Sequence, residues 1–368
     1  MKRIALILAV ILVALTAYLS LWPVPVDPVC WKAPTAPGYT GLHAVNNKLA
    51  GLKVISLGAE SGPEHIVLAK DGKLYAAVTH GNILRMNADG TAQEVFVNTG
   101  GRVLGFDFDA TGNLIAADAH KGLLSISPDR QITVLADKVG DDPIRFADAV
   151  VVAANGKIYF SDASTRFAAI RGVIGSDAVN ASLLDVIEQS ATGRILEYDP
   201  AAKTTRIVVR GLSFANGVAL SRDERTLFVV ETGRYRVWKI DVTATNLDIA
   251  LGAPQATVLL DNLPGFPDNL MRGLDGKIWL GLPVPRSAKL DGWAEKPFMR
   301  KLMLRLPSAM MPAIPPYGHA IAFTEDGKVV ADLQDPTGAF PNVTGITETA
   351  DRLYVQNLNT QGLGWLAR

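Results

Sequence analysis

Residues 148–159 read Asp-Ala-Val-Val-Val-Ala-Ala-Asn-Gly-Lys-Ile-Tyr: an acid, an apolar run, an Asn-Gly turn and a second apolar run. The pattern recurs around Gly72 and Gly276, where Glu64 and Asp268 stand eight residues before the glycine. Asn, Asp and Gly tolerate the positive φ angles of tight turns, so each copy predicts a β-hairpin. The chain therefore consists of repeated β-hairpins, each with one residue at a fixed distance before its turn.

Six such turns share this register, and each is preceded at the same offset by one residue at the start of an apolar strand. These six residues are Glu64, Leu104, Asp148, Asn216, Asp268 and His319. The turns recur about every 40 to 70 residues, and second hairpins such as 193–198 follow several of them. We expect an all-β, six-bladed β-propeller in which residues 52–55 and 352–355 share the blade that closes the ring. An open pair of β-sandwiches is the alternative, but it gives no reason for one shared register.

Four of the six register residues carry oxygen ligands, namely Glu64, Asp148, Asn216 and Asp268. In a ring of blades these side chains converge on the axis. Three acids and an amide at one point predict a site for one divalent cation, calcium or magnesium rather than zinc. A single acid at the start of a strand can instead cap a turn, but that does not explain four in register.

Composition excludes some partners. Apolar residues make up 48% of the chain, and 36 Lys and Arg balance 36 Asp and Glu. Zero net charge and the lack of a basic run in the body argue against a nucleic-acid partner.

The N-terminus is a separate unit. Lys2 and Arg3 precede an apolar run over residues 4–22, which is long enough to span a bilayer. We expect residues 1–22 to be a single-pass signal anchor, 23–50 a proline-rich linker and 51–368 the propeller on the non-cytoplasmic side. A cleaved signal peptide is the alternative, although no small-residue cleavage site precedes the prolines.

Motifs in every predicted blade resemble those of strictosidine synthase-like proteins, a group that includes the adipocyte plasma membrane-associated proteins. The motifs lie at residues 62–64, 101–106, 117–124, 158–164, 214–217, 231–237, 262–269 and 334–338. The resemblance spans roughly residues 55–365 and extends to the superfamily of regucalcin, gluconolactonase and paraoxonase. It implies a six-bladed propeller with a divalent cation, usually calcium, at the mouth of its channel. It also implies that Glu64, Asn216 and Asp268 are ligands, that Asp148 stands where related hydrolases often have Asn, and that Asp268 handles the attacking water.

The resemblance also bears on residues outside the ligand set. Related hydrolases of phosphotriesters have a channel histidine on the corresponding blade, so His319 is a candidate proton shuttle; a buried, hydrogen-bonded histidine is the alternative. Leu104 and His120 are candidate substrate-pocket residues, Leu104 as an apolar wall and His120 at the rim. True strictosidine synthases use a glutamate on the last blade, where this chain has Thr344, and Glu348 matches a different, non-catalytic acid. A condensing lyase is therefore disfavoured.

Residues 295–311 depart from the propeller pattern with a helical apolar stripe and four basic residues, among them Arg300 and Arg305. Three interpretations remain open: a lid over the channel, a helix at residues 296–306 lying on the membrane, and an insertion packed on the propeller.

The sequence thus predicts a membrane-anchored, metal-dependent hydrolase of a small ester or lactone, with Asp268 or His319 as the base. The alternative is a non-catalytic anchored propeller that binds a partner and keeps a structural metal.

Overall fold

The computed structural model describes residues 2–169, 177–307, 310 and 314–368, and within them six sheets form the blades of a propeller. Blade 1 contains β2 (His65–Leu68), β3 (Lys73–Ala77), β4 (Asn82–Asn87) and β5 (Glu94–Asn98). Blade 2 contains β6 (Val103–Phe108), β7 (Leu114–Asp118), β8 (Gly122–Ile126) and β9 (Ile132–Ala136). Blade 3 contains β12 (Ala147–Val152), β13 (Ile158–Asp162), β14 (Gly193–Asp199), β15 (Thr204–Leu212) and the short β19 (Leu247–Asp248).

The remaining blades follow the same order of antiparallel strands. Blade 4 contains β16 (Ala215–Leu220), β17 (Thr226–Glu231), β18 (Arg236–Asp241) and β20 (Ala256–Leu260). Blade 5 contains β22 (Leu270–Arg272), β23 (Lys277–Gly281), β25 (Gly318–Thr324) and β26 (Val329–Asp335). Blade 6 contains β27 (Val343–Glu348), β28 (Arg352–Asn357), β29 (Leu363–Ala367) and β1 (Lys53–Ile55). Smaller elements are β10 (Lys138–Val139), β11 (Asp142–Pro143), β21 (Gly265–Phe266), β24 (Val284–Pro285), η1 (Gly41–His43), η2 (Thr232–Arg234) and η3 (Ile249–Leu251).

The ring is closed by the two ends of the folded region. Strand β1 pairs antiparallel with β29, with Lys53 opposite Trp365 and Ile55 opposite Leu363. The expectation that residues 52–55 and 352–355 share one blade is confirmed. Each blade therefore has a neighbour on both sides, and the ring has no open end.

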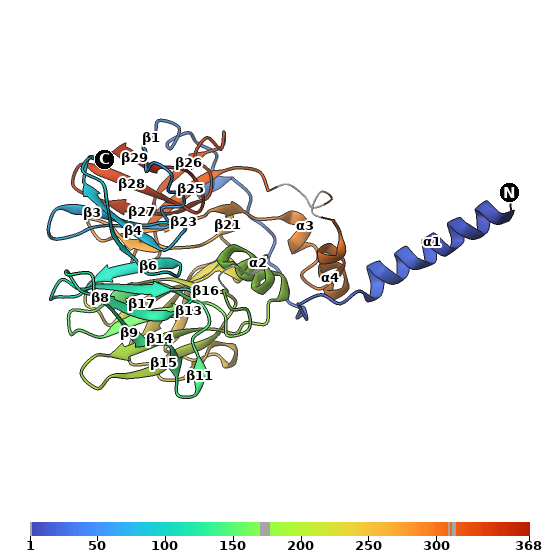
Figure 1. The fold of residues 1–368 in the computed structure, drawn as a ribbon, viewed down its shortest axis with the longest axis horizontal. Coiled ribbons are helices and arrows are strands. Elements are labelled where there is room, and N and C mark those ends of the chain that lie inside the picture. Colours follow the sequence, from blue (N-terminus) through green and yellow to red (C-terminus); the bar gives the residue numbers. More distant parts are fainter. Residues whose placement is uncertain (1, 170–176, 308–309, 311–313) are drawn as a thin grey trace.

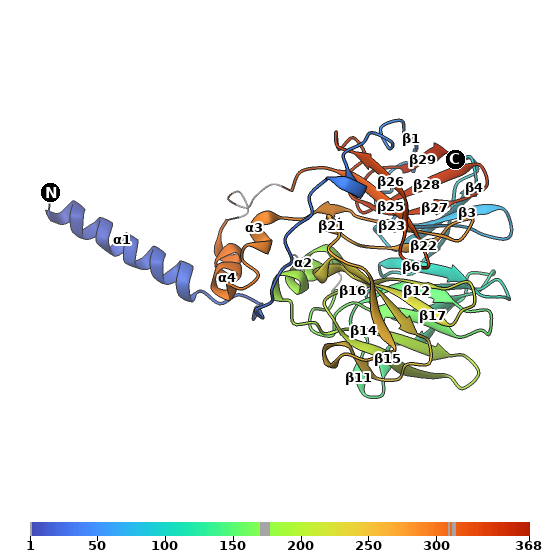
Figure 2. The same cartoon turned by 180° about the vertical axis from the view of Figure 1, so that it is seen from behind.

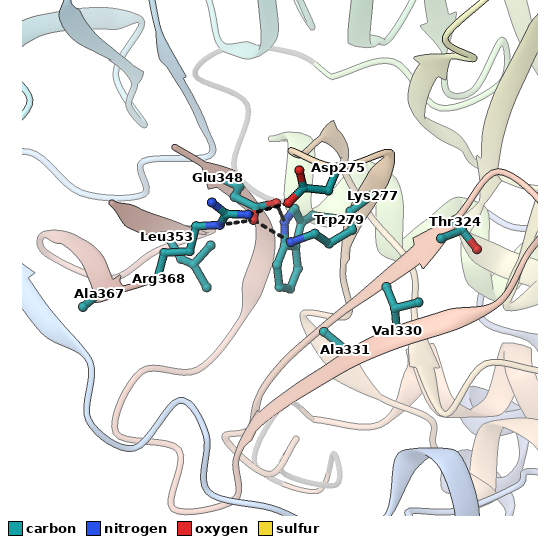
Figure 3. A pocket seen from close by; sticks show the side chains of 10 residues that line it. All are labelled: Asp275, Lys277, Trp279, Thr324, Val330, Ala331, Glu348, Leu353, Ala367 and Arg368. Atoms are coloured by element: carbon teal, nitrogen blue, oxygen red, sulfur yellow. Dashed lines mark hydrogen bonds and ion pairs between the residues drawn. The ribbon is translucent and has the colours of Figure 1, made fainter. Parts of the chain in front are cut away.

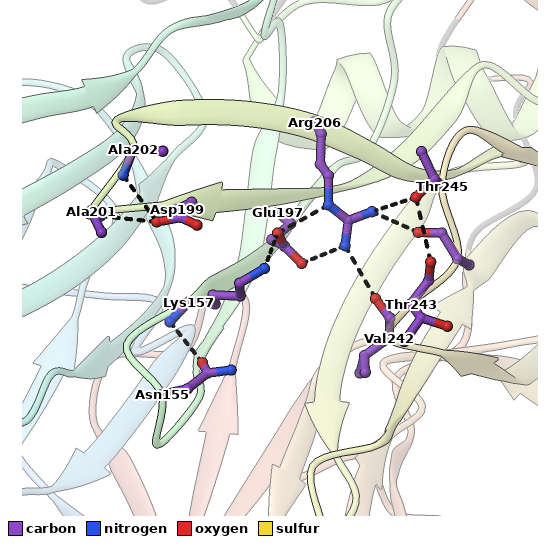
Figure 4. A network of polar contacts seen from close by, with 11 residues as sticks. Asn155, Lys157, Glu197, Asp199, Ala201, Ala202, Arg206, Val242, Thr243 and Thr245 are labelled. Atoms are coloured by element: carbon purple, nitrogen blue, oxygen red, sulfur yellow. Dashed lines mark hydrogen bonds and ion pairs between the residues drawn. The ribbon is translucent and has the colours of Figure 1, made fainter.

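The predicted turns join the first and second strands of a blade. Gly72, Gly156 and Gly276 have φ angles of 76°, 86° and 77°, which favour glycine. The lysine after a turn then ties strands together: in blade 3, Lys157 Nζ donates to Glu197 Oε1 at 2.8 Å, and Arg206 Nε donates to the same atom at 3.0 Å (Figure 4).

The connections between second and third strands lie at the opposite rim, beside the starts of the first strands. We call this rim the upper face. Helix α2 (Ala178–Glu188) is inserted there in blade 3, and helices α3 (Ala288–Asp291) and α4 (Pro297–Arg305) are inserted in blade 5. Figures 1 and 2 show all three helices on the side of the propeller that faces the N-terminal helix. The upper face thus carries the helical insertions.

Helix α4 is packed on the propeller. Met303 and Leu304 lie against the apolar cluster beneath it, and Arg300 is buried, donating to the carbonyl oxygens of Ile187 at 2.8 Å and Ala294 at 2.9 Å. Arg305 is buried as well. Of the three interpretations left open for this segment, the structure shows the insertion packed on the propeller, and the guanidinium groups of Arg300 and Arg305 donate to backbone carbonyls.

Helix α1 (Lys2–Leu21) projects from the propeller (Figure 2), and none of its residues is buried. By length and composition it can cross a membrane. Its last turn is held by α4: Arg305 Nε donates to Trp22 O at 2.7 Å and Arg305 Nη1 to Leu19 O at 3.0 Å. A cation at this end satisfies carbonyls that have no partner within the helix and offsets the helix dipole.

The predicted linker is a strap rather than a free tether. Residues 23–50, hereafter the strap, run along the upper face and then against blade 5. Val26 is buried, Val29 N donates to Glu188 O at 2.8 Å, and Leu49 N donates to Gln334 O at 3.0 Å. The sequence of the strap has no hydrophobic periodicity, but its backbone hydrogen bonds to the propeller fix its path.

Two truncated proteins test the roles of α1 and the strap. Residues 22–368 should fold and melt near the full chain in the same detergent, because α1 contributes nothing buried. Residues 32–368 should melt at least about 5 °C lower, because Val26 burial and the Val29 carbonyl that accepts from Arg300 are lost. Thermal unfolding followed by circular dichroism measures both. Aggregation of 22–368 while the full chain stays folded would instead place α1 in the core.

Candidate metal centre

The four predicted ligands stand at the starts of the inner strands of blades 1, 3, 4 and 5. Glu64 immediately precedes β2, Asp148 lies in β12, Asn216 lies in β16, and Asp268 precedes β22. All four are buried, with between 3% and 7% of their surface exposed. Their neighbours on the same rim are the strand starts that carry Leu104 and Thr344.

Irregular strand pairing marks this position in four blades. The register shifts fall between Val103 and Gly105, Ala147 and Val150, Ala215 and Val218, and Val343 and Gly345. Each shift brackets the residue at the site position. A β-bulge bends a strand and re-aims a side chain. These bulges can therefore turn the four side chains out of the regular alternation of their own sheets.

Neighbouring inner strands come very close here. A Cβ on Gly217 would lie 2.4 Å from Asp268 O, and one on Gly105 would lie 2.7 Å from Asp148 O. The Glu64 carbonyl accepts hydrogen bonds from Asn269 Nδ2 at 3.2 Å and Thr344 Oγ1 at 3.0 Å. Blades 1, 5 and 6 are therefore tied together directly beneath the carboxylates.

The three carboxylates interact through their charges. Burial raises the pKa of Asp268, and the negative charges of Glu64 and Asp148 raise it further. Burial also raises the pKa of Glu64 to about 7, against the opposing charge of Arg102. The pKa of Asp148 is raised by burial and then by Glu64. Like charges held close together in a desolvated site resist joint ionisation, which a bound cation would relieve.

Arg102 is a site residue that the sequence reasoning missed. Its Nη2 lies 3.4 Å from Glu64 Oε2, and its side chain is buried. The sequence feature that could have identified Arg102 is its position two residues before Leu104, one of the six residues in the shared register. One arginine against three carboxylates leaves a formal charge of −2 when all are ionised, which suits a divalent cation.

The amide oxygen of Asn216 is a second feature of these residues that fits a divalent cation. Asn216 Oδ1 is buried and accepts no hydrogen bond from any described residue. Hard cations take carboxylate and amide oxygens as ligands, and a buried amide oxygen without a donor is otherwise costly. Glu64, Asp148, Asn216 and Asp268 are thus suited to hold calcium or magnesium.

The expected register of His319 was wrong. Helices α3 and α4 separate β23 from β25, so the turn at Gly327 joins the third and fourth strands of blade 5 rather than the first and second. His319 lies on the third strand with its Nε2 3.2 Å from Asp332 Oδ2. The sixth register position belongs to Thr344, and His319 is the buried, hydrogen-bonded histidine of the alternative interpretation.

The two predicted pocket residues lie on the upper face. Leu104 belongs to an apolar cluster with Phe146 and Phe214, which also includes residues of α2, α4 and the strap. His120 is partly exposed after β7, and its backbone N–H donates to Asp118 Oδ1 at 3.0 Å. Leu104 is therefore packed beneath the insertions, and contact of either residue with a substrate stays a prediction.

Glu348 has a structural role. Its Oε1 accepts from Lys277 Nζ at 2.7 Å and Arg368 Nε at 2.8 Å, and its Oε2 accepts from Trp279 Nε1 at 2.9 Å (Figure 3). Burial opposes ionisation, but the bonds from Lys277 and Trp279 outweigh it and lower the pKa of Glu348. The cleft in Figure 3 includes Asp275 of a first-to-second-strand turn, so it opens at the rim opposite the carboxylates.

Comparisons with known proteins agree with the fold and its motifs. The sequence profile described as strictosidine synthase matches residues 148–245, and that of the strictosidine synthase-like N-terminal region matches residues 41–86. Strictosidine synthase-like protein 7 of Arabidopsis thaliana is 33% identical over 303 residues, 78% of this chain and 74% of that protein. The adipocyte plasma membrane-associated protein of Salmo salar is 29% identical over 339 residues, 85% of this chain and 77% of that protein.

Solved structures share the architecture at low identity. A gluconolactonase from Xanthomonas campestris superposes with a TM-score of 0.61 at 18% identity, covering 94% of this chain and 96% of that one. A calcium-binding protein, regucalcin, from Agrobacterium tumefaciens gives a TM-score of 0.50 at 14% identity, covering 83% and 92%.

The carboxylate cluster predicts an unusual pH dependence. Without a cation, Glu64 keeps its proton up to about pH 7 in the folded chain but loses it near 4.5 when unfolded. Between these values the folded state binds more protons, so the contribution of Glu64 to stability falls as pH rises and is lost above about 7. The pKa values of Asp148 and Asp268 are raised too, so both groups also make the folded state less stable as pH rises. The melting temperature of protein in a chelator should therefore fall from pH 5 to 8, and less steeply in Glu64→Gln. A rise across this range would contradict the described burial of the cluster.

Proposed function

Because the chain belongs to the strictosidine synthase-like family, we propose that it is a membrane-anchored, cation-dependent hydrolase of a small ester or lactone. The observation that carries the proposal is the buried cluster of three carboxylates and the unpartnered Asn216 amide oxygen. The likeness to a gluconolactonase and to a calcium-binding regucalcin supports the same class of substrate and cation, with calcium as the first candidate.

Glu64, Asp148, Asn216 and Asp268 would hold the cation, which supplies a Lewis acid that polarises the substrate carbonyl. Asp268 is the proposed base: its oxygen takes a proton from the water that attacks the carbonyl carbon. Asp268 suits this role because its carboxylate is buried among the proposed ligands, which shields it from bulk water. His319 is not proposed for this role, because its ring is engaged with Asp332 on an outer part of blade 5.

A second candidate function is an anchored propeller with a structural cation and no turnover. The packing of α2, α4 and the strap over Leu104 favours it, because those elements occupy part of the upper face. Lactonase and esterase assays on cation-free and calcium-loaded protein separate the two. A condensing lyase is not proposed, since Thr344 places a hydroxyl, hydrogen-bonded to Glu64 O, where that chemistry needs a carboxylate.

We also propose that α1 is kept as an anchor, with Lys2 and Arg3 on the cytoplasmic side and the propeller on the other. The hydrogen bonds from Arg305 to the end of α1 support an uncleaved helix over a signal peptide. The exposed ring of Phe298 would allow residues 296–306 to touch the bilayer surface, with Lys296 as the exposed basic group, since Lys301 is half-buried and paired with Asp27 at 2.8 Å.

The variant Asp268→Asn tests the proposed base. It keeps the shape and a coordinating oxygen but removes the proton acceptor, so kcat/KM for a lactone should fall at least about 100-fold while the chain stays folded. Asp261→Asn is the matched control, because Asp261 is exposed in the same segment and should leave turnover unchanged. Near-full activity in Asp268→Asn would exclude Asp268 as the base.

A further inference from the structure

A second polar cluster lies where the strap crosses blade 5. His43 ends η1 in the strap, His319 lies on β25, and Asp332 lies on β26. His43 Nδ1 is 2.8 Å and His319 Nε2 is 3.2 Å from the same atom, Asp332 Oδ2. The three side chains are 14%, 0% and 8% exposed, so the cluster is nearly closed and is reached from solvent beside His43.

The spacing of these atoms suits a small tetrahedral metal ion. Zinc binds imidazole nitrogen and carboxylate oxygen at about 2.0–2.2 Å, which places neighbouring ligand atoms about 3.3 Å apart. The two nitrogen–oxygen distances, 2.8 and 3.2 Å, lie just below that value, and all three ligand atoms lie within 4.8 Å of one another. Two imidazoles and one carboxylate favour zinc over calcium, whose ligands are oxygens.

Neighbouring groups already orient the carboxylate. Asp332 Oδ1 accepts from Asn46 Nδ2 at 3.1 Å and from Gln334 Nε2 at 2.5 Å, which turns Oδ2 toward the two imidazoles. Gln334 is itself fixed by Tyr317 OH at 2.7 Å. Outer partners of this kind hold metal ligands in place in known sites.

A buried hydroxyl also lies beside the cluster. The Tyr39 ring centroid is 5.5 Å from that of His319, and Tyr39 OH is buried with no hydrogen-bond partner in the described part of the chain. An unpartnered polar atom next to a three-ligand set is consistent with a missing fourth group, either the phenol itself or a water on the metal.

We propose that His43, His319 and Asp332 bind a zinc ion that fastens the strap to blade 5. The strap leads directly into β1, the strand that completes blade 6, so the ion would brace the closure of the ring. It would also fix the path from the membrane helix to the propeller. This site lies on outer strands and uses none of the residues of the proposed calcium centre.

The test uses the full chain in detergent micelles, purified without a histidine tag, stripped with a chelator and then saturated with calcium. Titration calorimetry should find one zinc ion bound per chain, and zinc should raise the melting temperature. Cobalt(II) in its place should give the visible absorption of a tetrahedral site. The variants His43→Gln and Asp332→Asn should weaken zinc binding at least about tenfold and abolish the thermal shift.

Two controls keep the result specific. His80→Gln removes an exposed histidine of blade 1 and should bind zinc as the unmodified chain does. Asp268→Asn should also leave zinc binding unchanged, since it alters only the other centre. His43 is partly exposed, so His43→Gln should fold even if substitution of buried His319 does not. Absence of stoichiometric zinc, or unchanged binding in His43→Gln, would overturn the proposal and leave a hydrogen-bonded His–Asp–His cluster.

Discussion

The close approach of the inner strands at the propeller axis is the constraint on which the site depends. A Cβ on Gly217 would lie 2.4 Å from Asp268 O, and one on Gly105 would lie 2.7 Å from Asp148 O, in each case a backbone atom of the neighbouring blade. No side chain fits at these two positions without a backbone shift, so the residue just before each glycine is the one that presents a side chain. Asn216 and Leu104 stand there, at bulges that turn them away from their sheets. The same crowding buries the acids of blades 1, 3 and 5 beside one another.

Burial of three carboxylates is unfavourable unless positive charge or protons compensate it. Arg102 supplies one positive charge beside Glu64, and the raised pKa of Glu64 shows that this is not enough to keep the whole cluster ionised near neutral pH. A divalent cation would balance the remaining negative charge of the cluster. Its binding would be linked to folding, because the ligands come from four separate blades. Cation binding is therefore expected of the closed ring and not of any one blade.

Much of this was readable from the sequence, because glycine turns, apolar alternation and a constant offset are local signals. They gave the six blades, the closing strand and the four candidate ligands. The predicted register of His319 was wrong because counting eight residues back from a turn assumes that the turn joins the first two strands of a blade. The insertion of α3 and α4 means that the Gly327 turn joins the third and fourth strands instead. Arg102 and the strap were missed because their roles rest on contacts across the fold, such as that between His43 and Asp332, which have no sequence period.

The most direct test of the central claim is the anomalous diffraction of crystals of the chain grown with calcium. We expect one peak at the upper face, with oxygens of Glu64, Asp148, Asn216 and Asp268 at about 2.3–2.6 Å from it. An empty position there, with the Arg102 guanidinium bridging the carboxylates in the presence of saturating calcium, would contradict it.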